Sequence, residues 1–169
     1  MKSPFTGKEM KVVYEKRTWN FRSEEYAYTH AAWLCADTNE LFTTDEMDDS
    51  GFLQVTNQYR AKYGIPYTDE IVSVRERYGL SAARMSLILG IGTNQWRLYE
   101  SGEVPSVSNG RMIRSIMDPS AFLCYVHSSR HLLDEKEYKK LSARIEEIAE
   151  ITERHGEEHY ALSRIFQCE

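Results

Sequence analysis

The spacing of apolar and polar residues divides the chain into a β-rich beginning and a helical remainder. Two runs, 10–19 and 25–34, mix β-branched and aromatic residues with charged ones, which is typical of strands. Residues 22–24 can turn the first run back on the second, so we expect an antiparallel hairpin. Residues 43–46, two threonines followed by two acids, then predict the start of a helix that extends to about Tyr63.

Beyond the Gly-Ile-Pro linker at 64–66, every segment has the apolar spacing and the end signals of a helix. The predicted helices cover 68–78, 81–89, 93–100, 107–117, 120–132 and 134–154, with room for one more near the end of the chain. Thr68, Ser81 and Thr93 are expected to cap the first three, because their hydroxyls can accept hydrogen bonds from unpaired helix N–H groups.

These elements predict an α+β protein in three parts. A small domain of one β-hairpin and one helix covers 1–65, an all-α domain covers 66–118, and a helical extension covers 119–169. The last long helix carries a two-heptad seam of Tyr138, Leu141, Ile145, Ile148 and Thr152. This seam suits either packing onto the core or a dimer interface.

Two of the short predicted helices are joined by a tight turn that contains Gly90 and Gly92. Small residues in such a turn let two steeply crossing helices approach, which is the geometry of a helix-turn-helix. In the helix that follows the turn, Trp96 and Tyr99 are three residues apart and are expected to be buried. We therefore expect a helix-turn-helix domain within 69–117.

The opposite face of the expected recognition helix, 93–99, carries polar side chains suited to reading DNA. We expect four residues to contact bases: Thr93, Asn94, Gln95 and Arg97. Asn and Gln can form two hydrogen bonds to adenine, and Arg can do so to guanine. Four more residues are expected to position the protein on phosphates: Ser81, Arg84, Ser106 and Arg111. Because one such module makes few base contacts, we expect a homodimer on palindromic double-stranded DNA.

The net charge of −5 does not by itself suggest a DNA-binding protein. Residues 69–117 carry six arginines against five acids, whereas both flanking segments are net acidic. So weak a balance is no nucleic-acid signature, and the interpretation depends on where the arginines point. The acidic balance leaves open an alternative, a protein-interaction module whose helix-turn-helix does not bind DNA.

Other functional classes find little support in the sequence. It has no long apolar run and no hydrophobic leader, so we expect neither a membrane span nor secretion. Three widely spaced cysteines, Cys35, Cys124 and Cys168, favour the reducing cytoplasm over a disulfide framework. No nucleophile–base pair or phosphate-binding loop is evident, and we expect neither an enzyme nor a cofactor. For Cys124, His127 and His131, ordinary surface roles are favoured over a metal site.

The stretch 80–106 resembles the Xre-type helix-turn-helix family. In that family Leu-Ser opens the second helix, Leu-Gly closes it, and Tyr-Glu-x-Gly with a nearby Pro-Ser ends the recognition helix. This chain has Leu80-Ser81, Leu89-Gly90, Tyr99-Glu100-Ser101-Gly102 and Pro105-Ser106 at the corresponding places. The resemblance implies a DNA-binding transcriptional regulator.

A wider resemblance, over about 3–117, is to the MqsA (YgiT-type) antitoxin family, whose members join an N-terminal zinc domain to an Xre-type domain. The zinc domain typically begins Cys-Pro-x-Cys-Gly-Lys and has a second Cys-x-x-Cys after a hairpin. Here the two elements read Ser3-Pro4-Phe5-Thr6-Gly7-Lys8 and Cys35-Ala36-Asp37-Thr38. Only Cys35 remains of the four ligand positions. Because structural zinc needs four thiolate or imidazole ligands, we predict that no zinc is bound.

The same resemblance implies that the N-terminal domain binds and neutralises a small toxin encoded nearby. A helix-turn-helix repressor without a toxin partner is the alternative. In the recognition helix, Asn94 falls on an Asn of the family, whereas the family's base-contacting Arg falls on Leu98, with Arg97 beside it. We therefore expect this chain to read a different DNA sequence from its relatives.

Overall fold

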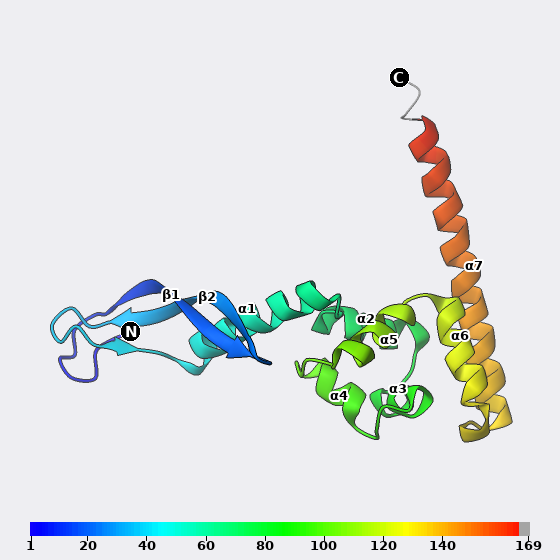
Figure 1. Ribbon diagram of the computed structural model, residues 1–169, viewed down its shortest axis with the longest axis horizontal. Coiled ribbons are helices and arrows are strands. Elements are labelled where there is room, and N and C mark those ends of the chain that lie inside the picture. Colours follow the sequence, from blue (N-terminus) through cyan, green and yellow to red (C-terminus); the bar gives the residue numbers. More distant parts are fainter. Residues whose placement is uncertain (166–169) are drawn as a thin grey trace. The chain divides into compact units, whose positions relative to one another are not determined.

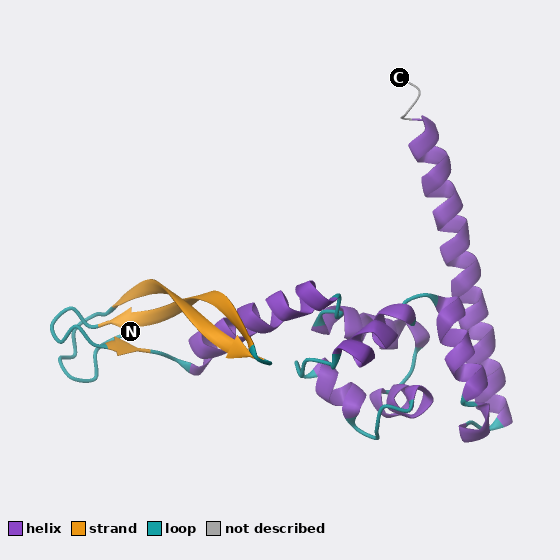
Figure 2. Ribbon diagram, in the orientation of Figure 1, coloured by secondary structure: helices purple, strands orange, loops and turns teal. Residues whose placement is uncertain are grey.

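The computed structural model describes the backbone of residues 1–165 and the side chains of residues 1–154 (Figures 1 and 2). Within that part of the chain, a three-stranded antiparallel sheet comes first and seven α-helices follow, which confirms the expected α+β fold. The chain divides into two compact units, and the division falls between Tyr63 and Gly64.

The first unit is built on a long hairpin. β1 (Lys11–Phe21) pairs with β2 (Glu24–Leu34) along its whole length, and β3 (Leu41–Phe42) adds a short third strand beside β2. Arg22 and Ser23 join the two long strands with φ of 50° and 67°. Two successive residues of positive φ form the tight turn that suits the twist of paired strands. The predicted hairpin is confirmed, with a two-residue turn in place of the expected three.

The helix α1 (Asp45–Tyr63) packs along β2. Its predicted start is confirmed, since the hydroxyl of Thr44 accepts a hydrogen bond from the N–H of Met47 at 3.4 Å. The amide of Gln54 bonds both the N–H and the C=O of Thr29, each at 3.0 Å. α1 thus satisfies backbone groups on an edge of β2 that no neighbouring strand reaches.

Aromatic and charged contacts fasten the end of α1 to the hairpin. The ring of Tyr59 packs edge-on against that of Tyr26, with 6.3 Å between centroids. The carboxylate of Glu24 receives Lys62 at 2.9 Å and also accepts the hydroxyls of Tyr26 and Tyr63. The hydrogen bond from Lys62, followed by those from the two tyrosines, lowers the pKa of Glu24 to about 2. This carboxylate therefore stays charged under ordinary conditions.

The second unit is helical throughout. Its elements are α2 (Thr68–Tyr78), α3 (Ala82–Leu89), α4 (Gln95–Glu100), α5 (Val107–Ser115), α6 (Pro119–Ser128), a 3-10 turn η1 (Arg130–Leu132) and α7 (Glu135–Ile165). Side chains from all six α-helices meet in one core, among them Ile71, Tyr78, Met85, Trp96, Ile113, Phe122 and Ile145. The rings of Tyr78 and Phe122 stack at 4.2 Å, so the C-terminal helices share the core of the helices before them.

The start of α2 differs from the prediction. The helix begins after Tyr67, whose N–H donates to the carboxylate of Glu70 at 2.8 Å. Thr68 therefore lies inside the first turn, and the expectation that it caps the helix was wrong. A Glu side chain three residues into a helix can bond the N–H that precedes it, so no capping hydroxyl is needed here.

The C-terminal helices also differ from those predicted. The segment 120–132 is α6 followed by η1, and α7 continues to Ile165 instead of ending near 154. The seam of α7 faces the core of its own unit, where Leu141 and Ile145 are buried. Although α7 is long, neither it nor any other helix in the described residues has an apolar stretch able to cross a membrane.

A close approach between α5 and the start of the second unit can be tested. A Cβ added at Gly110 would lie 2.7 Å from Cγ1 of Ile65, which is 1% exposed and branched at Cβ. Gly110→Ala is therefore expected to lower the free energy of unfolding by about 1–2 kcal/mol, because overpacking outweighs the better helix propensity of alanine. Urea denaturation measures this. Ser108→Ala, at an exposed site of α5, serves as the control, and equal midpoints for the two variants would contradict the prediction.

Candidate nucleic-acid interface

The turn between α3 and α4 depends on its two glycines. Gly90 ends α3 with φ 65°, and Gly92 has φ 102°. Residues with a Cβ rarely adopt such values, so the turn predicted from these glycines is confirmed. The turn runs on for two residues after Gly92, and α4 begins only at Gln95. The residue directly before the helix is Asn94, so the expectation that Thr93 caps this helix was wrong.

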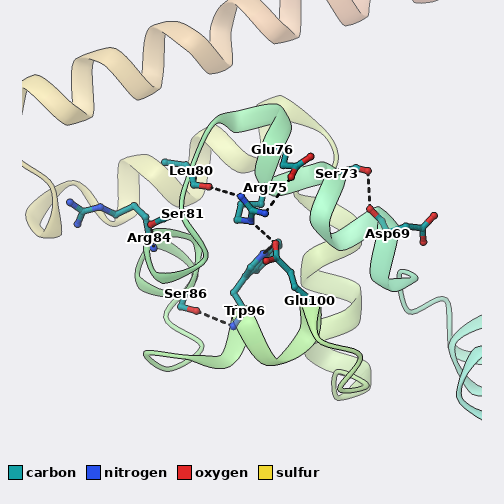
Figure 3. Close-up of polar contacts among 10 residues, drawn as sticks. All are labelled: Asp69, Ser73, Arg75, Glu76, Leu80, Ser81, Arg84, Ser86, Trp96 and Glu100. Atoms are coloured by element: carbon teal, nitrogen blue, oxygen red, sulfur yellow. Dashed lines mark hydrogen bonds and ion pairs between the residues drawn. The ribbon is translucent and has the colours of Figure 1, made fainter. Parts of the chain in front are cut away.

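A serine of α3 explains why α4 needs no cap of its own. Ser81 caps α3 as predicted, because its Oγ accepts the N–H of Arg84 at 3.2 Å. Ser86 is 1% exposed, and its Oγ accepts the N–H of Trp96 at 3.0 Å (Figure 3). That N–H belongs to the first turn of α4, where no carbonyl of the same helix can reach it. The cap of α4 is therefore supplied by the preceding helix.

A half-buried carboxylate ties α4 to α2. Glu100 receives the Nε of Arg75 at 2.5 Å and the indole N–H of Trp96 at 2.9 Å (Figure 3). Arg75 also donates to the backbone carbonyl of Leu80, just before α3, at 3.2 Å. Three helices are thus joined around one ion pair. In the sequence, Glu100 stands out only as part of a motif, and no local pattern indicates Arg75, which lies 25 residues earlier.

The burial of α4 agrees with the predicted face. Trp96 is fully buried and Tyr99 is 2% exposed, as expected. Asn94 and Arg97 are exposed, and neither side chain makes a hydrogen bond or ion pair with the described part of the chain. Gln95 is half-buried, and its amide donates to the carboxylate of Glu103 at 2.9 Å. The structure therefore leaves Asn94 and Arg97 presented to solvent, while Gln95 already has a partner.

Leu98 shares the solvent-facing side of α4 with Arg97. Its side chain is 44% exposed, although the neighbouring Trp96 and Tyr99 are buried. Thr93 is exposed as well, in the turn before the helix. Polar and apolar side chains are thus presented together at the start of α4 and along its outer face.

The residues expected to contact phosphates differ in their exposure and in the bonds that they already make. The hydroxyl of Ser106 accepts the N–H of Asn109 at 3.1 Å and caps α5, and Arg111 is exposed on that helix. Arg84 is half-buried and forms an ion pair with Glu137 of α7, with 2.7 Å between Nε and Oε1. Arg84, which is predicted to contact a phosphate, therefore already has a carboxylate partner.

An open cleft brings three of the eight expected residues together. Ser81, Arg84 and Thr93 line a space of about 670 Å³ beside α3, together with Leu87 and, from η1, Leu132. Asn94, Gln95, Arg97, Ser106 and Arg111 are not part of its lining. The cleft shows that the C-terminal extension borders the same surface as the α3–α4 pair.

A second cluster lies in the first unit, at the positions where the motif resemblance placed zinc ligands. Two tight turns face each other there: the N–H of Gly7 donates to the C=O of Ser3, and the N–H of Asn39 donates to that of Cys35. The Sγ of Cys35 lies 3.3 Å from the Oγ of Ser3 and 3.9 Å from the Oγ1 of Thr6. In a tetrahedral site with Zn–S bonds near 2.3 Å, ligand sulfurs are about 3.8 Å apart.

This cluster brings the expected ligand positions together but does not have the chemistry of a zinc site. Hydrogen bonds with Ser3 and then with Thr38 lower the pKa of the Cys35 thiol to about 6. In its neutral form the thiol donates to the Oγ of Ser3. Neutral hydroxyls are poor zinc ligands, and the residues present do not fit the metal. Among the described residues, no three His, Cys, Asp or Glu side chains gather into a metal-binding group. His127 belongs to no such group, and its Nδ1 lies 2.7 Å from the hydroxyl of Tyr138.

Comparison with known proteins finds no matching family model, no similar curated protein and no similar solved structure. The two family resemblances therefore rest on the short motifs quoted above.

The ion pair at the centre of the second unit gives a stability prediction. Glu100→Gln keeps an acceptor for Trp96 but cannot neutralise Arg75, which stays half-buried. We expect the free energy of unfolding to fall by about 2 kcal/mol, since one partner of a poorly solvated pair is lost. Glu76→Gln is the matched control, because Glu76 also contacts Arg75 but at 3.5 Å and with 64% of its side chain exposed. Denaturant unfolding that ranks the two variants equally would refute the expectation.

The geometry of the N-terminal cluster predicts that cysteine substitutions can introduce a zinc site. The triple variant Ser3→Cys, Thr6→Cys and Thr38→Cys would place four thiols on the two turns. We expect one zinc ion per chain in this variant and none in the native protein, because only the variant offers a full set of thiolate ligands. Elemental analysis after dialysis measures both. Stoichiometric zinc in the native protein, or none in the variant, would show that this interpretation of the turns is wrong.

Proposed function

We propose that this protein is a cytoplasmic, sequence-specific DNA-binding transcriptional regulator and not an enzyme. The observation that carries the proposal is the division of α4 into two faces. Trp96 and Tyr99 lock one face into the core, while Asn94 and Arg97 are presented to solvent from the other. In a helix-turn-helix, the N-terminal end of the second helix enters the major groove.

The side chains presented there suit base recognition. Asn94 has the donor and acceptor that adenine requires, and Arg97 has the paired donors that guanine requires. Arg97 has no competing ion pair within the described residues, unlike Arg75 and Arg84. The exposed Leu98 adds an apolar surface that can contact a thymine methyl group.

The acidic balance of the chain shapes how it would bind. A six-residue helix offers few base contacts, so a homodimer on a palindromic site is the form that reaches useful specificity. Because the net charge is −5, we expect weak attraction to DNA of arbitrary sequence. Discrimination would then rest on base contacts more than on phosphate contacts, and the dependence of affinity on salt would be shallow.

A gel-shift titration on the DNA upstream of the protein's own gene, at stated salt, tests the proposal. Asn94→Ala and Arg97→Ala are each expected to weaken specific binding about tenfold, the usual effect of losing one base contact. Arg17→Ala, on the exposed face of β1, removes a positive charge as Arg97→Ala does and is the control. Specific binding that is unchanged by Asn94→Ala and by Arg97→Ala would refute the assignment of the site. The absence of any specific binding would refute the proposed function.

For the first unit we propose a protein-binding role, as in an antitoxin that also represses its own gene. What supports this is that Ser3, Thr6, Cys35 and Thr38 lie together on two turns, at the positions where the sequence resemblance expects the ligands of an antitoxin zinc domain. A repressor without a toxin remains the competing proposal. Co-expression of the full chain with the product of the adjacent gene decides between them, since only the antitoxin forms a stable complex that relieves growth arrest.

A further inference from the structure

The ion pair between Arg84 and Glu137 joins α3, where phosphate contacts are expected, to the C-terminal extension. The contact is two-pronged, with Nε 2.7 Å from Oε1 and a terminal nitrogen 2.8 Å from Oε2. The two side chains are 36% and 27% exposed. A guanidinium uses this same two-nitrogen edge to bind a phosphate, whose oxygens have a similar spacing to those of a carboxylate.

Several contacts hold Glu137 where it is. Its N–H donates to the carboxylate of Asp134 at 2.7 Å, which caps the first turn of α7. The buried hydroxyl of Ser129 donates to the carbonyl of Ile88 at 2.7 Å and fixes the segment before α7 to the end of α3. Further along α7, Leu141 packs into the common core. These contacts place the start of α7 beside α3, from which the carboxylate of Glu137 reaches Arg84.

The surroundings of Arg84 are those of the expected phosphate contacts. It lies in the first turn of α3, and it lines the 670 Å³ cleft together with Ser81, Thr93 and Leu132 of the extension. A DNA strand passing over Ser81 would meet Arg84 with its two-nitrogen edge already occupied. The phosphate and the Glu137 carboxylate would then compete for the same donors.

We propose that Glu137 is an intramolecular competitor for the phosphate-binding edge of Arg84, so that the C-terminal extension lowers the affinity of the protein for DNA. The inference rests on the proposed function and adds a role for α7. A half-exposed ion pair is weak enough for a phosphate to displace. The extension therefore sets the strength of binding without abolishing it.

The test compares Glu137→Gln with Glu147→Gln in the full-length protein. Both remove one negative charge from α7, but Glu147 lies ten residues further on, where its side chain is exposed. On the upstream duplex, Glu137→Gln is expected to bind about fivefold more tightly than the control, as the loss of such a pair allows. Its log–log dependence of affinity on salt should steepen by about 0.9, the value for one further phosphate contact.

A second substitution separates competition from a general effect on folding. Arg84→Ala should cancel the gain of Glu137→Gln, and in the native background it should weaken binding less than it does in the Glu137→Gln background. Equal affinities of Glu137→Gln and Glu147→Gln, or weaker binding by Glu137→Gln, would overturn the inference while leaving DNA binding intact. If neither the native protein nor any variant shifts the duplex, the proposed function fails and the inference fails with it.

Discussion

The second unit depends on the carboxylate of Glu100. It lies between the guanidinium of Arg75 and the indole N–H of Trp96, and so joins α2 to the only large side chain that α4 buries completely. A helix of six residues cannot hold its own position in water. Its orientation comes from this pair, from the hydroxyl of Ser86 and from the burial of Trp96. The outward face of α4 is therefore presented by contacts on its inward face.

The C-terminal extension shares the core of the second unit. α6 and α7 contribute Phe122 and Ile145 to the cluster that contains Trp96, and no separate core exists for them among the described residues. The extension is part of the helical unit and not an appendage to it. Leu132 of η1 lines the cleft beside Ser81, and Glu137 of α7 pairs with Arg84, which lines the same cleft. That placement gives Glu137 its opportunity to act on Arg84.

In the first unit, a thiol and hydroxyl groups bring two backbone turns together. The turns at Ser3 and Cys35 each close with a backbone hydrogen bond, and the Cys35 thiol lies within 4 Å of the hydroxyls of Ser3 and Thr6. Elsewhere in the unit, the contacts of Glu24 with Lys62 and two tyrosines join the hairpin to α1. The cluster therefore offers one thiol among hydroxyl groups, which is not a ligand set for structural zinc.

The sequence by itself determined the elements whose signals are local. The alternation of strand residues, the glycines of the turn and the three-residue spacing of Trp96 and Tyr99 were sufficient for the hairpin, the α3–α4 pair and the buried face. Tertiary structure decided the contacts between distant residues. Thr93 does not cap α4 because Ser86 does so from another helix, and Arg84 is paired because Glu137, 53 residues later, is brought beside it. A capping signal or a charge shows what a residue can bond, whereas packing decides which partner reaches it.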